Sequence, residues 1–298
     1  MASQMSPEAA AEDGLVAVPG GEVWYRSVGE GGTPLVLLHG GPGLPQGYLA
    51  PHDALAVDRR LVYYDQLGCG RSDRPDDASL WTVERFVEEL QMVRDALGLD
   101  ELHLLGHSWG GSLALAYVLA HPDGVRSVTV TSGPASWPRF GDDMLKLKGE
   151  LPADVLETMD HHEQHGWQAC PEYQAAMMVF HQRHLCRMQW PEAFHVAMAQ
   201  TGAGVYGAMR GTHGWRPEGA LGSWDVMDRL GEIAAPVLLL AGRHDMCTPE
   251  HVAEVAERLP DARTTILEDS SHLAFFEQRD AYLAAVAGFL AEVEGGSR

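Results

Sequence analysis

Three side chains of this sequence, Ser108, Asp245 and His272, are of the types that catalyse acyl transfer together. A serine oxygen attacks a carbonyl carbon when a histidine takes up its proton and an aspartate holds that histidine in the required tautomer. Each of the three follows an apolar run that has the length of one buried strand. Their types and placement predict a serine hydrolase that works through a covalent acyl-enzyme and needs no metal or organic cofactor.

Ser108 lies at the centre of a G-x-S-x-G motif formed by residues 106–110. The apolar run 102–105 predicts a strand before the motif, and residues 112–119 predict a helix after it. A strand that turns at once into a helix holds the serine in a strained conformation and leaves no room for a Cβ atom at the two glycines. The motif therefore predicts a nucleophile elbow, with the serine at the positive end of the helix.

The loop after the predicted strand 34–38, His39-Gly-Gly-Pro-Gly43, is a candidate oxyanion-binding loop. Its glycines leave backbone N–H groups free to face a negatively charged oxygen. Hydrolases with an elbow use one N–H group from such a loop and one from the residue after the nucleophile. We assign these two donors to Gly41 and Trp109, and we expect Gly40 to contact the substrate.

Asp245 and His272 follow the predicted strands 236–240 and 264–267. Ligands of a parallel sheet bind at the carboxyl ends of its strands, which is where both side chains are expected. The chain order serine, aspartate, histidine is that of the α/β-hydrolase fold.

A further aspartate, Asp65, follows the predicted strand 61–64 but precedes the serine. Because the α/β-hydrolase order places the catalytic acid after the nucleophile, we interpret Asp65 as structural. Together with Arg71 it is expected to tie its loop beneath the site.

Strands and helices alternate along much of the chain, which predicts a mostly parallel sheet flanked by helices on both faces. Beyond the segments above, we expect a helix over 82–97, a strand over 125–130 and a hairpin with strands 15–18 and 22–28. The alternation stops near residue 133 and resumes near residue 233. The prediction is an α/β-hydrolase core of residues 14–132 and 225–298, an inserted helical cap of residues 133–224 and a disordered tail of residues 1–13.

The predicted cap is rich in tryptophan and methionine, as expected of a lid that closes over a substrate. We expect Trp137, Trp215 and the core residue Met246 to contact the substrate. His161 and His165 are four residues apart, a spacing that can bind zinc. The glutamate of an H-E-x-x-H motif and a clear third ligand are missing, so solvated or core histidines are favoured and no metal is predicted.

Composition bears on the partners and the compartment. The 42 acidic and 21 basic side chains give a formal charge of −21, which argues against nucleic acid or an anionic membrane as partner. No apolar run approaches the roughly 18 residues of a membrane span, and no signal-peptide pattern opens the sequence. The 4 cysteines have no C-x-x-C spacing and suggest neither a disulfide framework nor a zinc site. We expect a cytoplasmic protein that acts on a small molecule or short peptide.

The sequence resembles the proline iminopeptidases, and among them the short tricorn-interacting aminopeptidase, over nearly the whole chain after the first dozen residues. The matching segments are His39-Gly-Gly-Pro-Gly43, Asp65-Gln-Leu-Gly-Cys-Gly-Arg-Ser72, Gly106-His-Ser-Trp-Gly-Gly111, Pro171-Glu-Tyr-Gln174, Trp224-Asp225 and Ser271-His272. The resemblance implies a serine exopeptidase that removes an N-terminal residue, often proline, beneath a helical cap.

The resemblance also implies glutamates that hold the substrate's α-ammonium group, one directly after the triad aspartate and one in the cap. Here Met246 follows the aspartate, and the corresponding cap stretch 209–215, which includes Gly214, contains no acid. A buried ammonium without a paired carboxylate is strongly disfavoured. Either another acid such as Glu218 or Glu163 substitutes, or the substrate lacks a free amine.

Three functions follow from these patterns. The leading one is hydrolysis of small peptides or amino-acid amides. The alternative among enzymes is an esterase, lactonase or tailoring hydrolase for an uncharged small molecule, and the alternative outside enzymes is a non-catalytic small-molecule binding protein. Dehalogenase and epoxide hydrolase chemistry needs a carboxylate nucleophile, whereas position 108 is serine.

Overall fold

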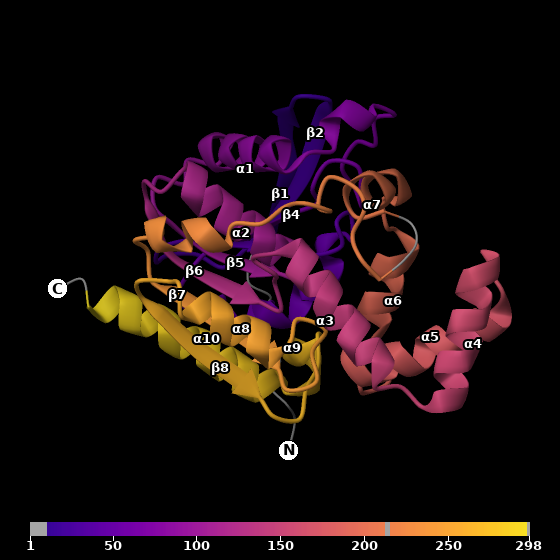
Figure 1. The fold of residues 1–298 in the computed structure, drawn as a ribbon. Coiled ribbons are helices and arrows are strands. Elements are labelled where there is room, and N and C mark those ends of the chain that lie inside the picture. Colours follow the sequence, from indigo (N-terminus) through magenta and orange to yellow (C-terminus); the bar gives the residue numbers. More distant parts are fainter. Residues whose placement is uncertain (1–10, 212–214, 297–298) are drawn as a thin grey trace, which may run out of the picture.

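The computed structural model describes residues 11–211 and 215–296. Its centre is an eight-stranded sheet with the order β1-β2-β4-β3-β5-β6-β7-β8, and helices lie on both of its faces (Figure 1). The six strands from β4 to β8 in this order are parallel, whereas β1 and β2 are antiparallel to their neighbours. This is the mostly parallel, doubly covered sheet expected from the alternation of strands and helices.

The strands are β1 (Ala11–Val18), β2 (Gly21–Val28), β3 (Leu35–Leu38), β4 (Leu61–Tyr64), β5 (Leu102–His107), β6 (Val125–Thr131), β7 (Val237–Gly242) and β8 (Ala262–Leu267). The α-helices are α1 (Val83–Ala96), α2 (Trp109–Ala120), α3 (Trp137–Gly149), α4 (Ala153–His165), α5 (Pro171–His184), α6 (Glu192–Ala199), α7 (Ala203–Met209), α8 (Pro249–Ala256), α9 (Ala274–Glu277) and α10 (Arg279–Gly295). Three 3-10 helices complete the described elements: η1 (Gln46–Leu55), η2 (Ala78–Leu80) and η3 (Met227–Glu232).

The first strand begins earlier than the sequence suggested. Residues 11–13, expected in the tail, pair with β2, and Ala11 lies opposite Val28. Asp13 accepts a hydrogen bond from the indole of Trp24 at 2.8 Å, so a polar residue on this edge strand has a partner in the fold. The remaining residues of the expected tail, 1–10, lie outside the described residues.

Each face of the sheet packs against its own set of helices because successive side chains of a strand point to opposite faces. On one face, alternate strand residues such as Val36 and Leu104 pack with apolar residues of α1, α2 and α8 in a cluster here called the main core. On the other face, Leu37 and Leu105 pack with η1, α9 and α10. The carboxyl ends of the parallel strands are thereby held at one edge of a rigid layer.

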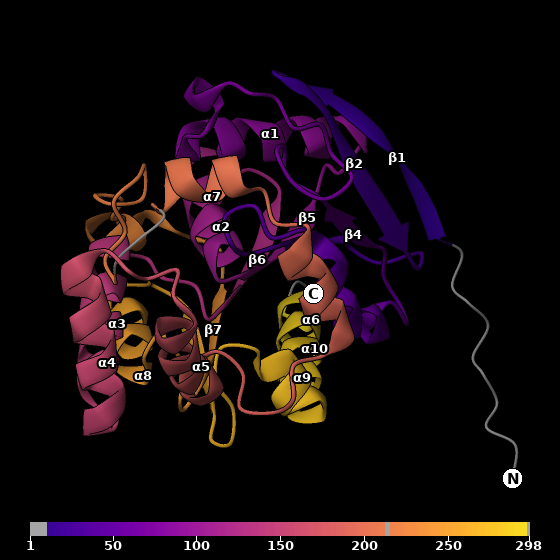
Figure 2. The ribbon, with the colours of Figure 1, turned by 90° about the vertical axis from the view of Figure 1, so that its right-hand side faces the viewer.

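Helices α3 to α7 all fall within residues 133–224, the segment expected as a cap, and α4 and α5 project furthest from the sheet (Figures 1 and 2). Seven buried residues form an apolar cluster within this segment, here called the cap cluster: Leu147, Leu151, Met159, Tyr173, Ala176, Phe180 and Trp215. The first turn of α3 and the buried side of α7 instead contribute Phe140 and Val205 to the main core. The segment therefore has a small core of its own and is anchored in the sheet domain at both ends.

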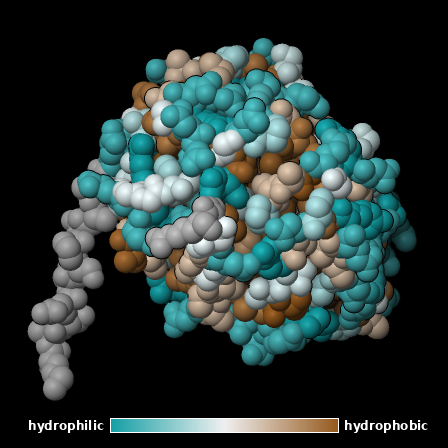
Figure 3. Space-filling view, turned by 90° about the vertical axis from the view of Figure 1, so that its left-hand side faces the viewer, coloured by the Kyte–Doolittle hydropathy of each residue, from teal (hydrophilic) through white to brown (hydrophobic). Residues whose placement is uncertain are grey.

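Hydrophilic side chains cover most of the face shown in Figure 3, with smaller hydrophobic areas between them. Within residues 11–211 and 215–296, no helix combines the length and the apolar character that crossing a membrane requires.

Candidate active site

The elbow around Ser108 has the geometry that its glycines predict. β5 runs into α2 through Ser108 alone, and this residue has a φ of 55°, in the region that non-glycine residues rarely adopt. A Cβ atom on Gly106 would lie 2.0 Å from the carbonyl oxygen of Gly110, and one on Gly110 would lie 2.1 Å from the carbonyl oxygen of Leu38. Only glycine fits at these two positions, and Ser108 remains partly exposed at the apex.

Asp245 and His272 are joined by a hydrogen bond from Nδ1 to Oδ1 of 2.7 Å. Both residues are almost fully buried, and the same carboxylate oxygen accepts the backbone N–H of Cys247 at 2.9 Å. Because a carboxylate can only accept here, the imidazole proton lies on Nδ1 and the lone pair lies on Nε2. The histidine thus has the tautomer of a general base.

His107 connects the loop of His272 to the end of β5. Its Nε2 atom lies 3.0 Å from the carbonyl oxygen of His272, and the centroids of the two imidazole rings are 4.9 Å apart. Ser132, at the end of β6, donates to the same carbonyl at 3.3 Å. Since His107 directly precedes Ser108, these contacts hold the histidine loop beside the elbow.

The oxyanion loop is shaped by a glycine in a left-handed conformation. Gly41 has a φ of 114°, and a Cβ atom there would lie 2.6 Å from the backbone nitrogen of Leu44. Among the described residues, neither the N–H group of Gly41 nor that of Trp109 has a hydrogen-bond partner. Two free donors close to a strained serine are what an oxyanion hole requires.

A chain of buried hydrogen bonds joins this loop to the histidine loop. The N–H of Gly40 donates to the hydroxyl of Tyr48 at 2.8 Å, and that hydroxyl lies 2.8 Å from Nδ1 of His107. The His272 carbonyl can only accept, so His107 carries its proton on Nε2 and accepts the Tyr48 proton at Nδ1. Burial lowers the pKa of His107 well below its usual value and raises that of Tyr48, so both side chains are neutral.

Sequence patterns did not identify Tyr48 or His107 as part of the site. The only signal for His107 is its position inside the G-x-S-x-G motif. Tyr48 lies in η1, which no periodicity predicted, and it reaches His107 only because η1 packs on the face of the sheet beneath β5.

Asp65 has the structural role expected for it, through the backbone of its loop. Its two carboxylate oxygens accept the N–H groups of Gln46 and Arg71, each at 2.9 Å. The Arg71 side chain instead lies over the ring of Trp24, 4.0 Å from its centroid. The loop is therefore held by a buried carboxylate and main-chain donors, without an Asp65–Arg71 ion pair.

Known proteins resemble this chain in sequence and in fold. A model of the α/β hydrolase fold family matches residues 33–278. A proline iminopeptidase of Heyndrickxia coagulans is 40% identical over 284 residues, which cover 93% of this chain and 98% of that one. A proline iminopeptidase of Saccharolobus solfataricus is 34% identical, with 95% and 93% of the two chains covered.

Two solved structures superpose on nearly the whole chain. The proline iminopeptidase of Mycobacterium smegmatis matches with a TM-score of 0.91 and 34% identity, covering 96% of this chain and 100% of that one. VinJ matches with the same TM-score, 35% identity and the same coverage. The chain belongs to the proline iminopeptidase family of α/β-hydrolases. It is accordingly an enzyme, a serine hydrolase of the proline iminopeptidase type.

Within this proline iminopeptidase fold, the tryptophans expected to touch substrate are largely buried. Trp137 is 2% exposed, and its indole N–H donates to Ser112 of α2 at 3.1 Å. Trp215 is 6% exposed and donates to Glu163 at 2.8 Å. Met246 packs against both the main core and the cap cluster. Direct substrate contact by these residues stays a prediction. The two buried tryptophans support α2 and the cap through their packing and indole hydrogen bonds.

The two acids considered as substitutes for the family's ammonium-binding glutamates are differently placed. Glu163 accepts from Tyr173 at 3.0 Å as well as from Trp215, and it forms an ion pair of 2.8 Å with Lys148. Its carboxylate is therefore already engaged inside the cap, where Lys148 also pairs with Asp160 at 2.7 Å. Glu218 is exposed, and Gly214, in the stretch expected to align with a family glutamate, lies outside the described residues.

The cap is tied to the histidine loop through its main chain. The N–H groups of His272 and Leu273 donate to the carbonyl oxygens of His184 and Leu185 at 3.2 and 3.1 Å. The C-terminal end of α5 and the loop of His272 are therefore parts of one hydrogen-bonded unit.

Proposed function

We propose that this enzyme hydrolyses the bond after the first residue of short peptides or aminoacyl amides, with Ser108 as nucleophile. The single observation that carries the proposal is the buried 2.7 Å bond between His272 and Asp245 on a loop held against the strained elbow. Family membership supports it, since relatives with this architecture are named proline iminopeptidases.

In the proposed mechanism, Nε2 of His272 takes the proton of the Ser108 hydroxyl as the serine oxygen bonds to the carbonyl carbon. Asp245 keeps the imidazole in place and stabilises its positive charge. The N–H groups of Gly41 and Trp109 donate to the resulting oxyanion. The imidazolium then protonates the leaving amine as the C–N bond breaks, and a water molecule hydrolyses the acyl-enzyme by the same steps.

The substrate side is where this chain departs from the resemblance. Met246 places a thioether next to the triad aspartate, and Glu163 is already paired with Lys148. An ammonium group entering beneath the cap would lose hydration unless a carboxylate replaced the water. These observations favour a second candidate, hydrolysis of esters or amides whose acyl side is uncharged.

We further propose that the enzyme works in the cytoplasm on small substrates. This compartment is supported by the cysteines, which are free thiols in the fold: Cys69, Cys170, Cys186 and Cys247. Disulfides are rare in reducing compartments, and the free thiols fit such a setting.

A substrate panel distinguishes the candidates. Prolyl and alanyl arylamides, their N-acetylated counterparts and short acyl esters would be assayed side by side with the wild type and Ser108→Ala. The aminopeptidase proposal expects the free-amine arylamides to have the highest kcat/KM and Ser108→Ala to lose turnover and fluorophosphonate labelling. Faster turnover of N-acetylated arylamides or esters would support the second candidate, and labelling that persists in Ser108→Ala would overturn the nucleophile assignment.

A further inference from the structure

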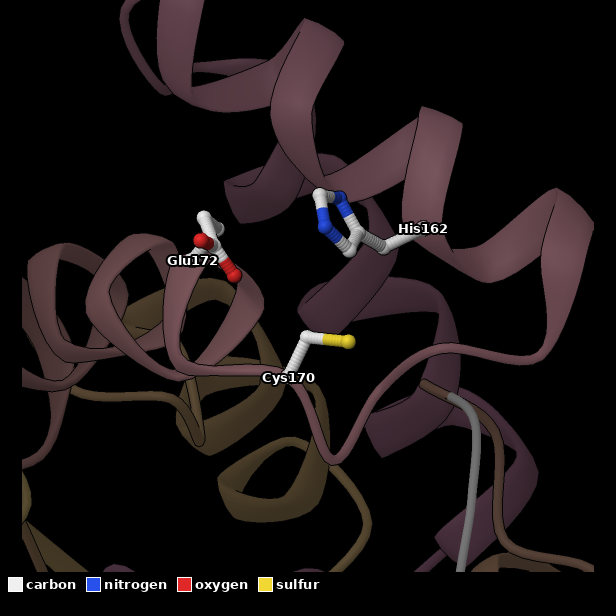
Figure 4. Close-up of side chains that lie close together, drawn as sticks. All are labelled: His162, Cys170 and Glu172. Carbon is white, nitrogen blue, oxygen red and sulfur yellow. The ribbon is translucent and has the colours of Figure 1, made fainter.

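The turn between α4 and α5 in the cap brings together three potential metal ligands of different chemistry. His162 lies in the last turn of α4, Cys170 is the N-cap residue of α5, and Glu172 lies in the first turn of α5. One ligand atom from each lies within 4.8 Å of the other two, and Figure 4 shows the three side chains around a common space. The sequence predicted no metal site, and the only zinc-like spacing it offered there, His161 and His165, belongs to two exposed side chains outside this group.

The orientation of His162 leaves the correct nitrogen free. Its Nδ1 atom lies 2.8 Å from the carbonyl oxygen of Thr158, which can only accept, so Nδ1 carries the proton. The lone pair is therefore on Nε2. Metal-binding histidines commonly donate their second ring N–H to a backbone carbonyl in this way, which fixes the ring and its tautomer.

The two other ligands lie at the start of a long helix. α5 has 14 residues, with Cys170 as its N-cap residue and Glu172 in its first turn, so one helix positions both ligands. Cys170 is partly exposed, whereas the other three cysteines are buried. Two anionic ligands and one neutral imidazole balance the charge of a divalent cation, and the formal charge of −21 attracts cations to the protein.

We propose that His162 Nε2, Cys170 Sγ and a carboxylate oxygen of Glu172 bind one Zn²⁺ ion, with water as the fourth ligand. Nitrogen, sulfur and oxygen donors in one set are typical of zinc. When the sulfur–metal bond forms, the thiol proton passes to solvent. Donor atoms of a tetrahedral zinc site lie roughly 3.5 Å apart, so the partly exposed His162 and Cys170 and the exposed Glu172 rotate inward by about 1 Å on binding.

Metal binding at this turn would fasten α4 to α5 beside the cap cluster. The residue after His162 is Glu163, which holds Trp215 and Lys148. A bound ion is thus expected to stabilise the outer part of the cap without contacting Ser108 or His272, and the proposal does not depend on the substrate.

The test is titration of the full-length, untagged and chelator-treated enzyme with Co²⁺, a spectroscopic substitute for Zn²⁺. The wild type is expected to bind one ion per chain and to develop the near-ultraviolet thiolate-to-cobalt charge-transfer band. Zn²⁺ should abolish the band by displacement and raise the Tm of the wild type. Absence of the band at one equivalent would overturn the proposal.

Matched variants locate the site. Cys170→Ser should lose the band, and His162→Ala should weaken Co²⁺ affinity by at least about tenfold, given that even second-shell changes cost that much. His165→Ala is the control, since His165 makes the same type of Nδ1 contact, to the carbonyl of His161 at 2.7 Å, outside the proposed site. Equal affinity in wild type, His162→Ala and Cys170→Ser would mean nonspecific binding to surface acids and would also overturn the proposal. Circular dichroism of each metal-free variant shows that the fold is retained.

Discussion

The hydroxyl of Tyr48 lies 2.8 Å from Nδ1 of His107, and this contact couples the two loops of the active site. On one side, Tyr48 accepts the N–H of Gly40, next to the proposed oxyanion donor Gly41. On the other side, His107 donates to the carbonyl oxygen of His272. The loop of Gly40 and the loop of His272 are therefore joined by one hydrogen-bonded chain of neutral groups.

Removing the middle of this chain should affect both stability and catalysis. Tyr48→Phe leaves the Gly40 N–H and Nδ1 of His107 buried without a partner, which typically costs about 1–3 kcal/mol per group. We expect a lower free energy of unfolding, measured in urea, and a lower kcat, because the oxyanion donor and the base lose their common support.

The control is Tyr63→Phe, which removes the hydroxyl that donates to Asp53 at 2.7 Å on a different part of the sheet. This variant should lose stability without a comparable loss of kcat. Equal kcat in Tyr48→Phe and wild type would show that the chain is structural only.

The choice of the catalytic acid is tested by two aspartates. Asp245→Asn should lower kcat by about 10⁴, the effect seen when a triad histidine is left in the wrong tautomer. Asp65→Asn should instead weaken the two main-chain hydrogen bonds that hold its loop, and so should mainly lower stability. Steady-state kinetics and urea unfolding of both variants are the measurement, and the reverse pattern would mean that Asp65 is the catalytic acid.

A carboxylate at position 246 should improve the binding of a free α-amine. Met246→Glu places an anion next to Asp245, at the point where the main core meets the cap cluster. The ratio of kcat/KM for prolyl arylamide to that for its N-acetylated counterpart should rise about tenfold, which corresponds to about 1.4 kcal/mol. Met246→Gln is the neutral control of similar shape and should leave the ratio unchanged. A wild type already fast on prolyl arylamide and insensitive to Met246→Glu would show that a different acid binds the amine.

Glu89 should make stability depend on pH. Burial raises its pKa from 4.5 to about 7, against the opposing effect of its ion pair with Arg85 and of the Leu67 N–H. The folded protein therefore binds more protons than the unfolded chain between these two values. The free energy of unfolding should fall as pH rises from about 4.5 to 7, by on the order of 1–3 kcal/mol.

Glu89→Gln isolates this contribution, because glutamine does not titrate. Urea unfolding of both proteins at pH 5 and pH 8 gives the difference in unfolding free energy between wild type and variant. The wild type should lose unfolding free energy relative to Glu89→Gln when the pH rises from 5 to 8. No change between the two pH values would mean that Glu89 keeps an ordinary pKa.

Local chemistry explains why much of the sheet could be predicted from sequence. The strand predicted over 61–64 agrees with β4, and the helix predicted over 82–97 agrees with α1 to within a residue or two. The elbow could be predicted because Gly106 meets the carbonyl of Gly110 only four residues away, whereas the contacts of Gly110 with the carbonyls of Leu38 and His39 depend on the folded sheet.

Contacts between distant segments could not be predicted in the same way. The Tyr48–His107 hydrogen bond spans 59 residues, and His162 meets Cys170 only after α4 and α5 fold back on each other. Ala11–Asp13 were predicted as part of the tail because they carry no apolar strand pattern. An edge strand does not need one, since its outer side can remain in water. The burial of Trp137 and Trp215 could not be predicted either, since composition alone does not show which side chains face the core.

The two main-chain bonds from His272 and Leu273 to the end of α5 also link the cap mechanically to the site. Residues 184–185 cannot move away from the sheet unless these bonds break or the loop of His272 moves with them. A change in the position of the end of α5 would therefore be transmitted to the proposed general base.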